Sequence, residues 1–201
     1  MKSNALLIVL FSAGCATTRG AAVPDYPGVL TSPAAHPGEF VRRQKLTARY
    51  RGQERSFEAV LQKQGDALTL IGLTPFGSKA FVLEQRGLEV KFTPYLAGDL
   101  PFPPRFVLQD VHRVYFGGLG DDAKADGEHT AEAQGERVRE VWQDGRLLSR
   151  EYTRLLADPP GSIAITYQGG MACCTSPERI ELENGWLGYH LSILTVSEER
   201  L

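Results

Sequence analysis

The sequence lacks the short motifs that identify common enzyme and nucleotide-binding families. Its 201 residues contain no G-x-S-x-G, no H-E-x-x-H, no Walker motif and no dinucleotide-binding fingerprint. Histidine is also scarce, with four residues, and none of them has a cysteine or histidine neighbour at metal-ligand spacing. We therefore expect a protein that is not an enzyme and that has neither a metal site nor another cofactor.

Neither sign of charge is in excess, and long apolar segments are also missing. The 22 basic and 24 acidic side chains give a formal net charge of −2 at pH 7. A near-neutral surface argues against binding to nucleic acid and against broad electrostatic attachment to anionic lipid. The unbroken apolar run from Ala5 to Phe11 is short, since a helix needs about 20 apolar residues to cross a bilayer. We expect no transmembrane helix.

The N-terminus is typical of an exported lipoprotein. Lys2 gives a short positive region, the apolar run follows, and small residues lead to Cys15. The sequence SAGC at 12–15 resembles the lipobox of bacterial lipoproteins, which implies that residues 1–14 are a signal peptide and that Cys15 is lipidated. Ala16 replaces the Asp that retains many lipoproteins in the inner membrane, so the resemblance implies a lipid anchor on the periplasmic face of the outer membrane. An ordinary secreted protein with a chance cysteine is the alternative.

Cysteine is scarce, and apart from Cys15 the chain has only the adjacent pair Cys173 and Cys174. Export implies an oxidising compartment, so a disulfide between these neighbours is one interpretation. Such a bond closes a small strained ring and would be labile. A loop clasp or two incidental thiols are the simpler interpretations, because no C-x-x-C motif supports a redox role.

The chain divides into a tether and one domain. Residues 15–35, which follow the signal peptide and include the lipidated cysteine, are rich in Ala, Thr, Gly and Pro and predict a flexible tether. Residues 36–201 have a length suited to a single domain. The sequence PGEFVRRQKL at 37–46 predicts a short first helix, because a proline stands near its start and apolar residues follow.

Short alternating segments follow and predict strands. Apolar residues occupy every second position through most of 55–62, 66–73, 79–85 and 88–92, and the breaks between these segments have the length of hairpin loops. The period changes to that of a helix in RFVLQDVHRVYFGG at 105–118. The pattern indicates an antiparallel meander that leads into a second helix.

The remaining chain returns to strands after a polar interruption. The glycine-containing segment 118–136 predicts a loop, and alternation resumes between 137 and 194. We expect about nine to eleven short antiparallel strands and two or three helices. A single layer of so many strands must curl to bury its apolar face. The predicted fold is mainly β (α+β), a single antiparallel and strongly curved open half-barrel with the helices as a lid.

Such a half-barrel can enclose an apolar cavity, which suits a carrier of acyl chains. The candidate wall residues are large apolar or aromatic side chains of the predicted strands, namely Phe57, Leu61, Leu70, Phe81, Leu83, Trp142 and Tyr167. Ordinary core packing is the alternative for each of them, since burial of a large apolar side chain contributes about 1.5–3 kcal/mol without any ligand.

The turn between two of these strands carries an unusual aromatic residue. Thr74-Pro75-Phe76-Gly77 fits a type I turn with proline at its second position, and Gly77 can adopt the left-handed conformation of a bulged three-residue loop. Phe76 then lies at the tip of the turn and points outward, toward a partner or a membrane. Contact with a neighbouring loop is the alternative.

These features together resemble LolB, the outer-membrane lipoprotein that accepts lipoproteins from the periplasmic carrier LolA. The resemblance rests on the lipobox, the tether, the meander, the segment LTPFGSKAFVLE at 73–84 and the closing strands at 176–194. In LolB a turn leucine protrudes and is needed for insertion of cargo into the membrane. Phe76 matches that leucine, and Pro75 and Gly77 match its neighbours. The resemblance implies a LolA/LolB-like fold, a membrane-insertion or cargo-transfer loop at these three residues, and a LolA-like carrier as partner.

A group of bacterial lipoproteins without an assigned function, which shares the LolB-like fold, is more similar still. It has a GLTPxG turn, here at 72–77, and a GYxLxI end, here at 188–193. Some of its members are encoded beside aryl-polyene or fatty-acid-like synthesis genes, which implies a different lipid or a polyene lipid as cargo. We expect a monomeric outer-membrane lipoprotein that binds acyl chains or another hydrophobic lipid and helps to transfer it to the outer membrane.

Two other functions stay open at this point. The chain could be a tethered accessory or scaffold of an envelope or aryl-polyene-type export system that carries no lipid. An enzyme or redox protein that uses Cys173 and Cys174 ranks third, since nothing in the sequence beyond the pair itself supports it. Binding of apolar ligands by the chain distinguishes the first function from both alternatives.

Overall fold

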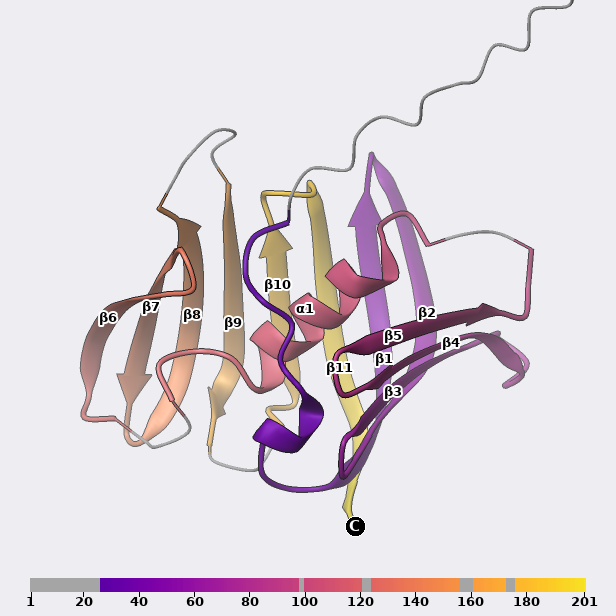
Figure 1. The fold of residues 1–201 in the computed structure, drawn as a ribbon, viewed down its shortest axis with the longest axis horizontal. Coiled ribbons are helices and arrows are strands. Elements are labelled where there is room, and N and C mark those ends of the chain that lie inside the picture. The colour runs from indigo at the N-terminus through magenta and orange to yellow at the C-terminus, as the bar shows by residue number, and fades with distance from the viewer. Residues whose placement is uncertain (1–25, 98–99, 121–123, 156–160, 173–175) are drawn as a thin grey trace, which may run out of the picture.

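The computed structural model describes residues 26–97, 100–120, 124–155, 161–172 and 176–201. Within them, antiparallel strands form one 11-stranded sheet in the order β5-β4-β3-β2-β1-β11-β10-β9-β8-β7-β6 (Figure 1). The elements are, in chain order, η1 (Pro33–Ala35), β1 (Phe40–Tyr50), β2 (Gln53–Gln64), β3 (Ala67–Leu73), β4 (Lys79–Arg86), β5 (Glu89–Pro94), α1 (Pro104–Tyr115), β6 (Gly127–Ala133), β7 (Glu136–Gln143), β8 (Arg146–Arg154), β9 (Ser162–Met171), β10 (Arg179–Asn184) and β11 (Tyr189–Arg200).

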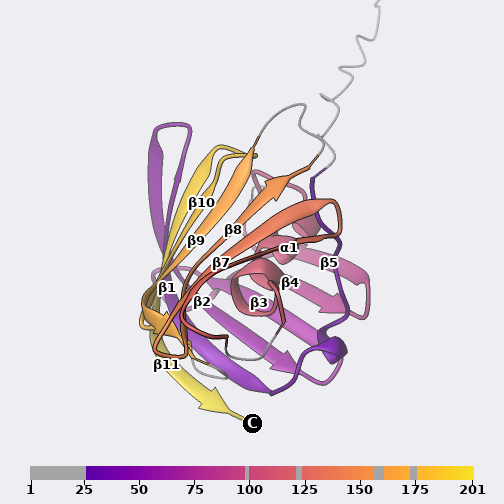
Figure 2. The same ribbon diagram turned by 90° about the vertical axis from the view of Figure 1, so that its left-hand side faces the viewer.

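The sheet is open and strongly curved, and α1 lies within its curl (Figure 2). Strands β5 and β6 are the two edges, and the first and last strands of the chain, β1 and β11, pair in the middle. The predicted fold class is therefore confirmed. The number of helices is lower than predicted, because the described residues contain one α-helix and one short 3₁₀ helix. No helix in this part of the chain is long and apolar enough to cross a membrane.

The predicted first helix at 37–46 is wrong, because this segment begins strand β1. Alternate side chains of the strand are buried, but two of them are polar. Arg42 is paired with Glu198 at 3.1 Å, and Gln44 donates a hydrogen bond to the Tyr115 hydroxyl at 2.6 Å. Polar residues at inward positions hide the period of two from any hydrophobicity pattern.

The predicted loop at 118–136 contains strand β6. This strand pairs with β7 in continuous register from Gly127 to Ala133, and most of its residues are exposed. Since water reaches both faces of this edge strand, its sequence has no alternation of polar and apolar residues. Its composition therefore looks like that of a loop.

The first described residues form a strap, 26–36, that crosses α1 (Figure 1). Nearly all of this strap lies within the segment 15–35 that was predicted to be the tether. Tyr26 is buried, and its ring stacks on Phe106 of α1 with ring centroids 4.6 Å apart. The Gln109 side chain donates a hydrogen bond to the Gly28 carbonyl at 3.0 Å. The folded unit thus includes the strap, and the stretch before Tyr26 lies outside the described residues.

Candidate ligand cavity

A cavity lies between α1 and the concave face of β1–β5 and β11. Its volume is about 570 Å³, within the range of about 300–1,000 Å³ that small-molecule pockets occupy. Strands, helix and the connection between β5 and α1 all contribute to its wall. Because α1 lies inside the curl of the sheet, helix and strands face each other across this space (Figure 2).

Aromatic and aliphatic side chains line the inner part of the cavity. Phe57, Leu61, Leu70 and Phe81, which the sequence analysis proposed as wall residues, all line it. They come from β2, β3 and β4, whose period of two places them on the concave face. The ring centroids of Phe57 and Phe81 are 6.3 Å apart, and those of Phe81 and Phe92 are 6.0 Å apart. This end of the cavity is suited to an apolar chain.

The position of the Phe81 ring depends on Gly72. The two residues are cross-strand partners on β3 and β4. A Cβ atom at position 72 would lie only 2.2 Å from the Phe81 ring, so the ring occupies the space that any other residue would fill. Glycine therefore allows an aromatic ring to lie directly against the strand, and it shapes the cavity without contacting a ligand.

Helix α1 supplies the facing wall. Val107, Val111 and Val114 recur at the spacing of one helix face and line the cavity. The helix begins at Pro104, where a missing N–H costs nothing because first-turn N–H groups have no helical partner. The predicted helix at 105–118 is thus confirmed in type, although it starts one residue earlier and ends at Tyr115.

The opposite end of the cavity is more polar and lies near the hairpin that joins β1 and β2. Tyr50, Phe102 and Tyr189 form an aromatic group there, with centroid separations of 4.9 Å and 5.1 Å to the central Phe102 ring. Gln53 and Arg55 of β2 also line this end. The cavity wall is thus apolar at one end and carries a cation at the other.

The other three proposed wall residues lie in the core outside the cavity. Leu83 is fully buried and is not among the lining residues. Trp142 is buried between strands, and its indole N–H donates to Glu140 at 3.0 Å. The Tyr167 hydroxyl donates to the Val114 carbonyl at 2.9 Å. Tyr167 thus ties α1 to the sheet, and Leu83 and Trp142 belong to the core. The sequence alone could not separate these roles from a cavity wall.

The turn at 74–77 projects from the sheet. The Gly77 N–H donates to the Thr74 carbonyl at 2.9 Å, and Gly77 has a φ of +79°. The Phe76 side chain is 95% exposed, so its ring does not rest against a neighbouring loop in the described part of the chain. Tyr95 and Leu96 are also exposed, and both donate to the Ala80 carbonyl near the same edge of the sheet. Together they leave an apolar edge beside the cavity.

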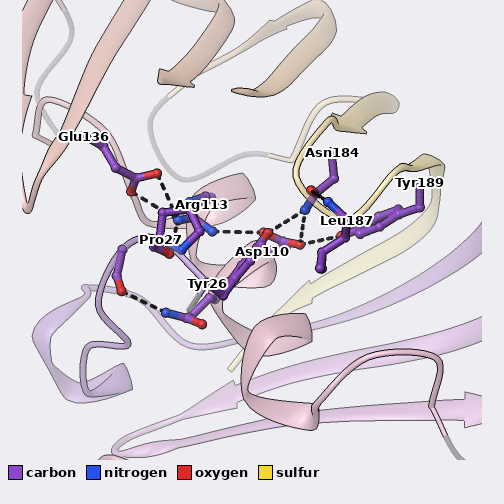
Figure 3. Close-up of polar contacts among 10 residues, drawn as sticks. Tyr26, Pro27, Asp110, Arg113, Glu136, Asn184, Leu187 and Tyr189 are labelled. Atoms are coloured by element: carbon purple, nitrogen blue, oxygen red, sulfur yellow. Dashed lines mark hydrogen bonds and ion pairs between the residues drawn. The ribbon is translucent and has the colours of Figure 1, made fainter. Parts of the chain in front are cut away.

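A buried polar network joins the strap, α1 and strands β7, β10 and β11 (Figure 3). The Asp110 carboxylate accepts hydrogen bonds from the hydroxyls of Tyr26 and Tyr189. Arg113 lies 3.1 Å from this carboxylate and also 3.1 Å from Glu136 of β7. Burial raises the pKa of Asp110, whereas the Arg113 guanidinium and the two hydroxyls act in the opposite direction. Both oxygens of Asp110 are thus bonded within the protein. These bonds tie α1 to the strap and to β11.

A second buried ion pair fixes the C-terminal end of α1. Arg150 of β8 lies 2.8 Å from Glu140 of β7, and neither side chain is more than slightly exposed. Arg150 also donates to the Arg113 carbonyl at 2.9 Å. Glu140 accepts a further hydrogen bond from the Leu119 N–H at 3.1 Å. Sequence reasoning missed both networks, since charged residues in strands and helices are normally solvated.

His112 connects the helix to β4 and to the strap. Its Nε2 lies 2.7 Å from Gln85 Oε1, and its Nδ1 lies 3.2 Å from the Thr31 hydroxyl. Burial, with a smaller contribution from His36, lowers the pKa of His112 to about 4. The ring is therefore neutral at pH 7, so it donates to Gln85 and accepts from Thr31.

Some sequence predictions lie outside the described residues. Cys15, the proposed lipidation site, is one of them, and so are the adjacent cysteines Cys173 and Cys174. Lipidation and the state of the cysteine pair therefore stay predictions. Within the described ranges, no group of three or more His, Cys, Asp or Glu side chains could hold a metal ion.

Three solved structures are similar to this chain at low sequence identity, and the similarity extends over most of both chains. A LolA superfamily protein from Nitrosomonas europaea has a TM-score of 0.45 and 9% identity, with 81% of this chain and 86% of that chain covered. A putative outer membrane lipoprotein-sorting protein domain from Vibrio parahaemolyticus has a TM-score of 0.41 and 11% identity, with coverage of 81% and 85%. A DUF1329 family protein from Desulfovibrio piger has a TM-score of 0.44 and 13% identity, again with 81% and 85% covered.

Comparison with curated proteins finds no match. The model of one family does match, and it covers residues 41–197, from the first strand to the last. That match includes every strand that contributes to the cavity and the whole of α1. The chain therefore belongs to the family described as "Protein of unknown function (DUF3261)".

Proposed function

We propose that this protein binds the hydrophobic chain of a lipid or a similar cargo in its cavity and helps to transfer that cargo to the outer membrane. The observation that carries the proposal is the apolar cavity between α1 and the sheet, with Phe57, Phe81 and Phe92 at its inner end. Binding is reversible and no bond of the cargo is broken, so the protein acts as a carrier and not as an enzyme.

The composition of the wall supports an apolar ligand. Side chains with few hydrogen-bonding groups face the inner cavity, so water there finds few partners and is easily displaced. Each Å² of apolar ligand surface removed from water contributes about 25 cal/mol. An acyl or polyene chain that fills the cavity therefore gains affinity from burial alone, while the polar end of the cavity fixes its orientation.

The exposed turn supplies a way to reach a membrane. An aromatic ring that is 95% exposed gains no folding energy from its apolar surface, whereas insertion at a lipid interface would bury it. Pro75 and Gly77 fix the turn that presents Phe76. Because the apolar edge at Tyr95 and Leu96 borders both the turn and the cavity, cargo could leave the cavity close to the membrane surface.

The remaining parts of the proposal come from the sequence and its resemblance to LolB. Acylation of Cys15 would hold a monomeric domain at the periplasmic face of the outer membrane, and the residues before the strap would be its tether. A LolA-like periplasmic carrier would deliver the cargo. Mass spectrometry of the mature protein would test the anchor, since a lipid-modified N-terminal cysteine has a characteristic mass.

Ligand displacement tests cavity binding directly. The full chain with Cys15→Ala, which has no acyl anchor of its own, is loaded with a fluorescent apolar dye and titrated with fatty acids and detergents. We expect displacement by ligands with a single long chain. Ala48→Trp, on the cavity side of β1, should weaken binding at least about tenfold, because the indole fills the cavity. Lys45→Trp, on an exposed position of the same strand, is the matched control.

Two outcomes would contradict the proposal. If no apolar ligand displaces the dye from the folded wild-type chain, the protein is not a carrier of hydrophobic chains. The same conclusion follows if Ala48→Trp and Lys45→Trp bind as well as the wild type, because binding would then occur outside the cavity. Mass spectrometry of lipids that copurify with the Cys15→Ala chain would identify the natural cargo.

The turn is tested by a change of polarity at its tip. Phe76→Glu should leave the melting temperature nearly unchanged, since the ring makes few contacts within the protein. It should also reduce transfer of bound lipid to vesicles, whereas Phe76→Leu should retain transfer. A large loss of thermal stability together with normal transfer would show that Phe76 has a structural role.

A further inference from the structure

We propose that the cargo is an amphiphile with an anionic head group, and that Arg55 binds this head group at the polar end of the cavity. The inference rests on the proposed function, because it assigns a ligand class to the same cavity. It starts from the distribution of charge over the two faces of strand β2.

The convex face of β2 has its charges paired. Glu58 accepts from Arg43 at 2.7 Å, and Glu54 accepts from Arg49 at 2.5 Å. Both arginines belong to β1, so the pairs cross between neighbouring strands. Both carboxylates of β2 on this face are therefore paired with arginines of the neighbouring strand.

Arg55 lies on the other face of β2 and has no such partner. Among the described residues, no carboxylate oxygen lies within 4.0 Å of its guanidinium, and its recorded hydrogen bond is a long one of 3.4 Å to Gln53 Oε1. The other charged residue that lines the cavity is Asp110, whose carboxylate is already bonded within the buried network. Arg55 is thus the cation of the cavity wall whose charge is left for a ligand.

Arg55 lies where the cavity opens to solvent. Pairing between β2 and β3 ends at Glu58, so the part of β2 that carries Gln53 and Arg55 extends beyond the neighbouring strand. Figure 1 shows the β1–β2 hairpin projecting past the ends of β3, β4 and β5. Water can therefore reach the guanidinium, and a head group bound there would stay partly hydrated while its chain enters the cavity.

The cavity then has the polarity of an amphiphile. Phe57, the next residue on the same face of β2, begins the apolar wall that continues to Phe81 and Phe92. A ligand that places an anion on Arg55 would therefore place its chain along these rings. A neutral or cationic amphiphile would leave the arginine without a partner or would be repelled by it.

The chemistry of the guanidinium defines the class of head group. Arginine presents a planar set of N–H donors that matches two oxygens of one carboxylate or one phosphate. Both head groups offer two oxygens that share a negative charge, whereas an ester or an alcohol has no charged oxygen. Because hydrogen bonds between charged groups are stronger than neutral ones, we expect about a tenfold or greater preference for the anion.

The experiment compares head groups on one chain. The Cys15→Ala chain is loaded with an uncharged apolar dye and titrated, below their aggregation concentrations, with hexadecanoic acid, hexadecyl phosphate, methyl hexadecanoate and hexadecyltrimethylammonium. We expect one or both anions to displace the dye at about tenfold lower concentration than the ester, with the cation weakest. Preference for the carboxylate would indicate a free fatty acid or polyene acid, and preference for the phosphate would indicate a phosphate-headed lipid.

Substitution of Arg55 then tests the residue itself. Arg55→Gln should remove the preference for the anions and leave displacement by the ester unchanged. Arg43→Gln, on the convex face, should keep the preference, and so provides the matched control for loss of an arginine. If Arg55→Gln does not fold, Arg55→Lys should fold and retain a reduced preference, since it keeps the charge without the paired donors.

The possible failures are distinguishable. Equal displacement by the anions and the ester from the wild-type chain would overturn the role of Arg55 and leave apolar binding in the cavity intact. A preference for anions that persists in Arg55→Gln would overturn the assignment as well. If none of the four compounds displaces the dye, the proposed carrier function itself fails.

Discussion

Helix α1 has two sides that differ in kind. Toward β7–β9 its end is held by directional bonds, since Arg113 pairs with Glu136, Arg150 donates to a helix carbonyl, and the Tyr167 hydroxyl donates to another. Toward β1–β5 it presents valines to a cavity of about 570 Å³, and its hydrogen bonds to these strands run from His112 to Gln85 of β4 and from Gln44 of β1 to Tyr115. One side is filled with polar networks, and the other is left hollow.

This difference explains how the cavity on the hollow side of α1 stays open. Atoms that border an empty apolar cavity lose dispersion contacts, so an unsupported helix would collapse onto the facing strands. Hydrogen bonds and ion pairs fix both distance and direction, which apolar packing alone does not do. We infer that the polar networks on the filled side, together with the bonds of His112 and Tyr115 to β4 and β1, hold α1 at a fixed distance from β1–β5.

The largest expected effect is on the filled side. Glu140→Ala leaves the Arg150 guanidinium buried without its carboxylate, which should lower the free energy of unfolding by about 3–5 kcal/mol. Urea denaturation measures the loss. Glu128→Ala removes an exposed partner of Arg139 from the neighbouring edge strand and should cost less than about 1 kcal/mol. Equal effects of the two substitutions would show that the buried pair is not what fixes the helix.

The next prediction compares two leucines that face each other across β3 and β4. Leu83 is fully buried in the core, whereas Leu70 is a cavity-wall residue with 7% exposure. Leu83→Ala should cost about 2–5 kcal/mol and change ligand affinity little. Leu70→Ala should cost less, since part of its side chain already borders empty space, and should alter the ligand chain length that binds best. Thermal unfolding and dye displacement separate the two effects, and identical profiles would argue against a cavity at Leu70.

A third prediction concerns pH and the side of α1 that contacts β4. The folded-state pKa of His112, about 4, is below the ordinary histidine value, so the unfolded chain binds a proton that the folded chain excludes. The contribution is fully present above about pH 6.5 and is lost as the pH falls from there toward 4. The loss should reach about 2–3 kcal/mol.

The measurement is urea denaturation across that pH range. His112→Gln cannot titrate but keeps an amide that can bond to Gln85, so its unfolding free energy should fall less steeply with pH than that of the wild type. Parallel curves for the two proteins would mean that His112 is not excluded from protonation by folding.

The hollow side of the molecule was the easier one to predict from the sequence. Strands β2 to β5 bury apolar side chains at alternate positions, so their period shows directly which residues face inward, including Phe57 and Leu70. The helix wall was predictable for the same reason, because its valines recur at helical spacing. A cavity lined by apolar residues leaves the same hydrophobic pattern in the sequence as a packed core does.

The filled side could not be predicted in the same way. Its inward positions include Glu136, Glu140 and Arg150, which a hydrophobicity pattern assigns to the surface. Arg42 had the same effect in β1, where it contributed to the wrong prediction of a helix. Pairing partners far apart in the chain decide such burial, and one sequence does not reveal them. The strap at Tyr26 was assigned to the tether because its bonds to α1 are long-range as well.

The smallest effect is expected at Tyr189, which belongs to both sides. Its hydroxyl donates to Asp110 in the buried network, and its ring stacks on Phe102 at the open end of the cavity. Tyr189→Phe keeps the ring and removes the donor, so unfolding should become easier by about 1 kcal/mol while ligand affinity stays unchanged. Tyr50→Phe is the matched control, because this ring also contacts Phe102 and its hydroxyl has no hydrogen-bond partner among the described residues; it should alter neither quantity. If Tyr189→Phe weakens ligand binding as much as it weakens folding, the polar network and the cavity are one unit, and the distinction between the two sides of α1 fails.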